Sequence, residues 1–184
     1  MIRIEENGLH VVMDVSPEGD VRLLHFSALP FDEDTVGQAS RPWFRLVEVQ
    51  CSGAGQEAHH GSKHTGTVPG RRLRYKAHTD ERNAAGRKID VTLEDDGLVV
   101  VSHMQFYDGV AVVRAWTEVR NEGARKRGLE YVSSFALTGI EKEGRKSRDK
   151  KSRVHIGHNS WNQEMQWRQY SLPELGLSLA NPKH

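Results

Sequence analysis

The stretch KIDVTLEDDGLVVVSHMQFYDGVAVVRAWTEVRNEGARKRGLEYVSS, from Lys88 to Ser134, decides the fold. Apolar and polar residues alternate along it, and side chains two residues apart share one face of a β-strand. Two short polar turns that contain glycine, 95–97 and 108–109, interrupt the alternation, and such residues favour the positive φ angles of tight hairpin turns. The stretch therefore predicts an antiparallel meander whose second and third strands cover 98–107 and 110–120.

The same alternation predicts further strands on both sides of this meander. They cover residues 2–4, 9–15, 21–29, 43–51, 73–79 and 128–140. A long loop, 52–70, interrupts the series, and we expect no helix or strand inside it because glycine and proline recur through it. Short strands joined by turns bury a core only when sheets stack, so the sequence predicts an all-β antiparallel sandwich.

Length and composition favour one soluble domain over residues 1–184, with 36% hydrophobic residues. The 26 basic residues nearly balance the 25 acidic ones, so the chain has no overall positive field to hold a nucleic acid. Residues 1–7 contain glutamates where a signal peptide would need an apolar run, and no membrane span or membrane partner is expected. A cytoplasmic location follows, and the single cysteine, Cys51, rules out an internal disulfide.

Two segments near the C-terminus lack the strand pattern. Residues 142–153 carry many lysines and arginines with almost nothing apolar between them, which predicts a flexible, solvated loop. Residues 177–184 are mildly apolar and end without a closing element. We therefore expect the sandwich to be incomplete at its C-terminus.

The loop 52–70 contains the first candidate site residues. His59, His60 and His64 lie close together in the sequence, but adjacent side chains diverge in extended backbone and the ligand spacing does not match a known zinc site. We predict neither a metal nor a cofactor. A polar loop that packs on another domain is the simpler interpretation, and it makes His59, His60 and Lys63 candidates for an interface or the rim of a substrate site.

A second group of candidates combines aromatic rings and carboxylates. Trp161 and Glu164, with Trp167 nearby, have the residue types that hold sugars, because an indole covers the apolar face of a sugar and a carboxylate accepts from its hydroxyls. Closing a core or an interface is the alternative role for these tryptophans. His103 and Glu118, on neighbouring predicted strands, are the only pair we nominate for base and carboxylate chemistry.

Several motifs recur together in one known family. They are HHGSKH at 59–64, PGRRLRY at 69–75, FYDG at 106–109, VRAWTEVRNEG at 113–123, YVSSF at 131–135 and NSWNQE at 159–164. With these motifs, the chain resembles the N-terminal domain of α-galactosidases in glycoside hydrolase family 36. The resemblance covers nearly the whole chain.

This resemblance implies a β-supersandwich of the galactose-mutarotase-like kind, which in the family precedes a catalytic (β/α)8 barrel. The family's catalytic aspartates lie on the barrel, which is not part of residues 1–184, so the resemblance implies no catalytic residue here. It implies the barrel of the same parent chain as a partner, and a possible homo-oligomer. The parent enzyme would hydrolyse terminal α-galactosides.

Three functions therefore compete at this stage. The first is a non-catalytic N-terminal sandwich of an α-galactosidase-like enzyme, which would be inert alone. The second is a free-standing carbohydrate-binding module that uses Trp161 and Glu164. The third is a mutarotase-like epimerase that uses His103 and Glu118.

Overall fold

The computed structural model describes residues 1–35, 45–56, 65–137 and 152–176. The chain divides into two compact units, Met1–Gly139 and Ile140–His184, and each is described by itself. Within the described ranges, no helix is long and apolar enough to cross a membrane.

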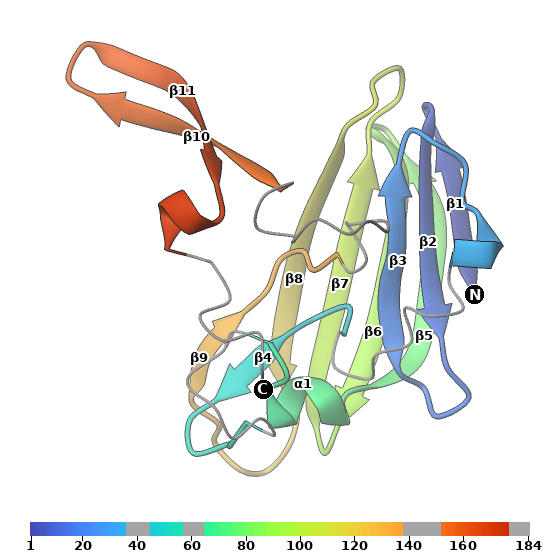
Figure 1. The fold of residues 1–184 in the computed structure, drawn as a ribbon. Coiled ribbons are helices and arrows are strands. Elements are labelled where there is room, and N and C mark those ends of the chain that lie inside the picture. The colour runs from blue at the N-terminus through green and yellow to red at the C-terminus, as the bar shows by residue number, and fades with distance from the viewer. Residues whose placement is uncertain (36–44, 57–64, 138–151, 177–184) are drawn as a thin grey trace. The chain divides into compact units, whose positions relative to one another are not determined.

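The first unit opens with a three-stranded antiparallel sheet (Figure 1). Its strands, in spatial order, are β1 (Ile2–Glu6), β2 (Leu9–Val15) and β3 (Val21–Ser27). Asn7 and Gly8 have φ angles of 50° and 77°, which give the two-residue turn between β1 and β2 the twist of a tight hairpin. A short 3-10 helix, η1 (Glu33–Thr35), follows the sheet.

A four-stranded antiparallel sheet forms the second layer and confirms the predicted meander. Its strands, in order, are β5 (Arg74–Asn83), β6 (Gly86–Asp95), β7 (Leu98–Phe106) and β8 (Val113–Asn121). β5 continues four residues beyond the predicted end at residue 79, and its polar tip pairs with β6 up to Asn83 opposite Gly86. Every residue of β7 is buried, and β7 is an inner strand that pairs with β6 on one side and β8 on the other.

A third, smaller element joins β4 (Val49–Cys51) to β9 (Leu129–Val132). The predicted strand 128–140 was too long, since only four residues of it pair in the described part of the chain. The expectation of no helix inside the loop 52–70 was also wrong. A one-turn helix, α1 (Val68–Arg72), begins there, with Thr67 as its N-cap and proline in its first turn.

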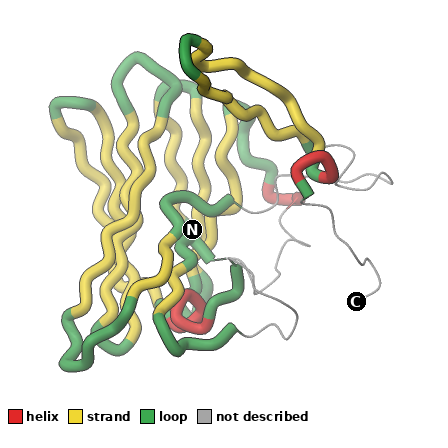
Figure 2. Tube along the Cα trace, turned by 90° about the vertical axis from the view of Figure 1, so that its left-hand side faces the viewer, coloured by secondary structure: helices red, strands yellow, loops and turns green. Residues whose placement is uncertain are grey.

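The core lies between the three-stranded and four-stranded sheets (Figure 1), and Figure 2 shows the same strands turned by 90°. Apolar residues at alternate positions of both sheets fill it, and β4 closes one side. Its most deeply buried members include Val11, Leu23, Val49, Ile89, Val100 and Phe106. The all-β, antiparallel, sandwich-like fold predicted from the sequence is confirmed.

The second unit contains one antiparallel hairpin, β10 (Arg153–Ser160) and β11 (Gln163–Ser171), followed by the 3-10 helix η2 (Pro173–Leu175). The predicted basic loop 142–153 falls mostly outside the described residues, and its last residue, Arg153, is the first residue of β10. A hairpin of this kind has two faces and no second layer within its own described residues. It therefore has no interior in which to bury large apolar side chains.

Candidate functional site

The tip of the β10–β11 hairpin holds the candidate pair Trp161 and Glu164. Trp161 and Asn162 form the two-residue turn, and Asn162 has a positive φ of 59°. The Trp161 side chain is 92% exposed, and together with Glu164 it lines a shallow, open hollow. The Met165 backbone N–H donates to the Asn159 side-chain oxygen at 2.8 Å, at the irregularity in strand pairing that lies beside the turn. The two predicted residues therefore do lie together.

The same hairpin exposes two further apolar side chains, Met165 and Trp167, which are 57% and 62% exposed. Trp167 pairs with Gly157 across the hairpin, and an indole carbon lies 3.6 Å from where a Cβ of Gly157 would be. The Trp167 ring therefore lies beside Gly157 at ordinary van der Waals distance. Trp161, Met165 and Trp167, which we call the hairpin apolar group, have no interior of their own to enter.

His59, His60 and Lys63 lie outside the described residues, but the chain that follows them is firmly anchored. Glu48, only 3% exposed, accepts from the Gly66 N–H at 3.1 Å, from the Thr67 N–H at 3.3 Å and from the Thr67 hydroxyl at 3.0 Å. The Thr67 hydroxyl oxygen in turn accepts from the Gly70 N–H at 3.1 Å and caps α1. One buried carboxylate therefore fixes the end of the glycine-rich loop and the start of the helix.

Glu48 was not singled out from the sequence, which placed it on one face of an alternating strand over 43–51. The structure buries every residue from 45 to 51 on both faces, and only Val49–Cys51 forms a strand. A glutamate flanked by Leu46, Val47 and Val49 was the available signal. A charge in such a place is tolerated only when hydrogen bonds satisfy it.

His103 and Glu118, the pair nominated for base chemistry, do share one face of the four-stranded sheet. The His103 Nδ1 lies 2.7 Å from an oxygen of Asp90, and its Nε2 lies 3.6 Å from an oxygen of Glu118. The Trp116 ring stacks on the imidazole with 4.7 Å between centroids and 14° between planes. The imidazole is 8% exposed, so a carboxylate on either side and an indole on its face leave no approach for a sugar.

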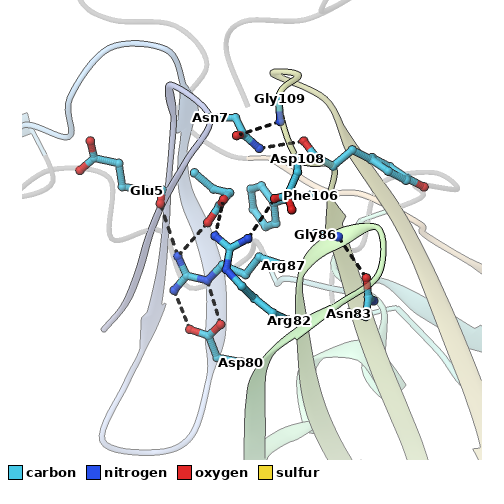
Figure 3. Close-up of polar contacts among 12 residues, drawn as sticks. Glu5, Asn7, Asp80, Arg82, Asn83, Gly86, Arg87, Phe106, Asp108 and Gly109 are labelled. Atoms are coloured by element: carbon cyan, nitrogen blue, oxygen red, sulfur yellow. Dashed lines mark hydrogen bonds and ion pairs between the residues drawn. The ribbon is translucent and has the colours of Figure 1, made fainter.

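An ion-pair network fastens β1 to the β5–β6 hairpin at one end of the sandwich (Figure 3). Arg87 binds both oxygens of Asp80, at 2.8 Å from Nε and 2.6 Å from Nη2, and the bidentate bond holds the pKa of Asp80 below its ordinary value. Arg82 binds Glu6 at 2.7 Å and Asp108 at 2.9 Å, and these bonds, that to Glu6 first, raise the pKa of Arg82. These ion pairs link β1 to the β5–β6 hairpin.

A second link in Figure 3 joins the β1–β2 turn to the β7–β8 turn. The Asn7 side-chain amide donates to the Tyr107 carbonyl at 2.8 Å and accepts from the Gly109 N–H at 3.3 Å. Both sheets are thereby tied at the same end.

Comparison of the chain with protein-family models and with curated proteins finds no match. Among the residues that the structure describes, no group of three or more histidine, cysteine, aspartate or glutamate side chains is placed to hold a metal ion. The described carboxylates discussed above either bind cations and backbone N–H groups or stand at an open hairpin tip.

Proposed function

We propose that this chain is the non-catalytic, cytoplasmic N-terminal β-sandwich domain of an α-galactosidase-like glycoside hydrolase. It supports a separate catalytic (β/α)8 barrel that hydrolyses terminal α-galactosides. The resemblance in six motifs supports this family, and the antiparallel sandwich is the architecture that this role requires. In this role the sandwich contributes no catalytic acid.

The observation that carries the proposal is the hairpin apolar group. An isolated two-stranded hairpin is marginally stable in water, and three large apolar side chains exposed on one hairpin mark a contact surface. Tryptophan and methionine are also enriched in the buried centres of protein interfaces. The proposed occupant of this surface is the catalytic barrel of the same parent chain.

The rest of the first unit suits a supporting role. Glu48 is fully engaged with backbone N–H groups, and the Arg82 and Arg87 network ties the sheets together at one end. Such bonds rigidify a frame, because each engaged charge holds two elements in one geometry. A rigid frame with an exposed apolar hairpin is suited to holding a larger neighbour in place.

Two measurements test this proposal. Sequencing of the gene beyond His184 should give a barrel-sized continuation with two aspartates at the carboxyl ends of barrel strands. Acrylamide quenching of Trp161 and Trp167, each studied in a variant with the other tryptophans replaced by phenylalanine, should weaken when the barrel is attached. A stop codon shortly after His184, or quenching that the barrel leaves unchanged, would exclude the supporting role.

A carbohydrate-binding module is the second candidate, and the placement of Trp161 beside Glu164 favours it. An exposed indole next to a carboxylate at an open hollow can stack on a sugar and accept from its hydroxyls. Calorimetric titration with galactose and raffinose tests this function. Saturable binding that disappears in Trp161→Ala and survives in Trp167→Ala would support the module, and an absence of binding heat would exclude it.

A further inference from the structure

A depression of about 320 Å³ lies where the end of β4, the start of α1 and the segment before β9 meet. Four charged side chains line it: Arg72, Lys126, Arg127 and Asp95. The buried thiol of Cys51 also lines it. All these residues belong to the first unit, and the tip of the hairpin lies in the other unit, so the depression is independent of the surface discussed above.

The cations of this depression are only partly neutralised by the residues that the structure describes, since Arg127 forms an ion pair with Asp96. Arg72 and Lys126 make no hydrogen bond and no ion pair there. Arg127 uses one terminal nitrogen for Asp96, at 2.6 Å from the carbonyl oxygen and 2.9 Å from a carboxylate oxygen, while its Nε is buried without a partner. Two cations without a partner in the described part of the chain, beside the guanidinium of Arg127, attract an oxyanion.

The walls of the depression are already formed. The Ser52 N–H donates to the Gly128 carbonyl at 2.8 Å, and the Ala54 N–H donates to the Cys51 carbonyl at 3.0 Å. The two segments approach closely, since a Cβ at Gly128 would lie 2.6 Å from the Ser52 hydroxyl. A ligand would therefore enter a preorganised site without having to order its walls.

We propose that this depression binds the anionic group, a phosphate or a carboxylate, of a small hydroxylated molecule. Arg72, Lys126 and Arg127 hold the anionic oxygens. Asp95, which also has no side-chain partner in the described part of the chain, accepts from a hydroxyl of the same molecule. The volume is at the lower end of small-molecule sites, which fits an anion with a few carbons.

Three probes of one carbon skeleton separate the possible ligands: glycerol 3-phosphate, glycerate and glycerol. Each probe is titrated into the protein and the heat of binding is measured by calorimetry. The ionic strength is kept constant, so that salt screens the charges equally in all three titrations. We expect saturable binding of at least one anion and none of neutral glycerol. Preference for glycerol 3-phosphate assigns a phosphate ligand, and preference for glycerate assigns a carboxylate ligand.

A matched pair of double variants tests the residues. Arg72→Gln/Lys126→Gln should weaken binding by at least about tenfold, because the loss of a single charge-assisted hydrogen bond already lowers the affinity by about that factor. Arg168→Gln/Lys76→Gln removes the same charge from other places and should leave the affinity within about twofold. If the first double variant fails to fold by circular dichroism, the single variant Lys126→Gln takes its place.

Cys51 gives an independent readout because it is the only thiol of the chain. Burial raises the pKa of the Cys51 thiol, so we expect slow labelling by a disulfide reagent at neutral pH. An anion in the depression should slow the labelling further, with the same midpoint as the calorimetric titration. The proposal is overturned if no probe binds saturably, or if both double variants bind equally well.

Discussion

Glu48→Gln replaces a buried carboxylate by an amide of the same shape, and we expect it to lower the free energy of unfolding of the first unit by about 2–4 kcal/mol. Both oxygens of Glu48 accept, one from the Gly66 N–H at 3.1 Å and the other from the Thr67 N–H and hydroxyl at 3.3 and 3.0 Å. In glutamine one oxygen becomes an NH2 donor, so in either orientation at least one backbone N–H faces another donor. The loss of one or two charge-assisted bonds of about 1.5–3 kcal/mol gives the expected range.

Urea unfolding followed by far-ultraviolet circular dichroism measures this change, and a loss of about 3 kcal/mol also lowers Tm by roughly 10 °C. Glu81→Gln is the matched control, because Glu81 is an exposed residue of β5 and loses the same charge. We expect the control to stay within about 0.5 kcal/mol of the unsubstituted chain. Equal unfolding midpoints for the two variants would refute the assignment of Glu48 as the anchor of the loop and of α1.

Two further predictions concern turns and charges of the first unit. Gly97 and Gly109 have φ angles of 75° and 79°, but a Cβ at Gly97 would lie 2.6 Å from the Gly123 Cα and one at Gly109 would meet nothing within 4 Å. Gly97→Ala should therefore destabilise the sandwich by about 1–3 kcal/mol more than Gly109→Ala in urea titrations, and equal losses would show that the close contact is absent. The bond from Arg87 lowers the pKa of Asp80 in the folded state. The stability that this bond contributes is therefore fully present above the pKa of Asp80 in the unfolded chain, and it is lost as the pH falls through the pKa of Asp80 in the folded state. Asp80 is 42% exposed, so solvent weakens its ion pair. Between about pH 5 and pH 2, the Asp80→Asn variant should therefore lose only about 0.5 kcal/mol less of its free energy of unfolding than the unsubstituted chain does. Equal losses in the two proteins would contradict the pairing.

Local signals explain why most of the four-stranded sheet was predictable. The turns at Asp95–Gly97 and Asp108–Gly109 fix the ends of β7 within one residue, because turn chemistry and alternation both depend on neighbours in the sequence. The polar tip of β5 was missed because residues 80–83 show no alternation. Pairing with β6 and the bonds from Arg82 to Glu6 and Asp108 hold this tip, and neither is visible in the local sequence.

The candidate sites depended more on contacts between distant segments. The one-turn helix α1 is too short for helix propensity to reveal it, and it forms because Thr67 caps it and Glu48 holds Thr67. His103 and Glu118 were correctly paired, but the stacking of Trp116 that closes their face depends on three-dimensional packing. Trp161 and Glu164 were found together because a tight hairpin turn keeps near neighbours close.

Hydrolysis of an aryl α-galactoside by the purified chain tests the central claim most directly. We predict no release of the phenol above a protein-free control at any pH between about 4 and 8, since the catalytic acids of the proposed enzyme lie on its barrel. The preparation must first be freed of host α-galactosidase. Turnover that persists after that step, and that a single substitution in this chain abolishes, would contradict a purely supporting domain.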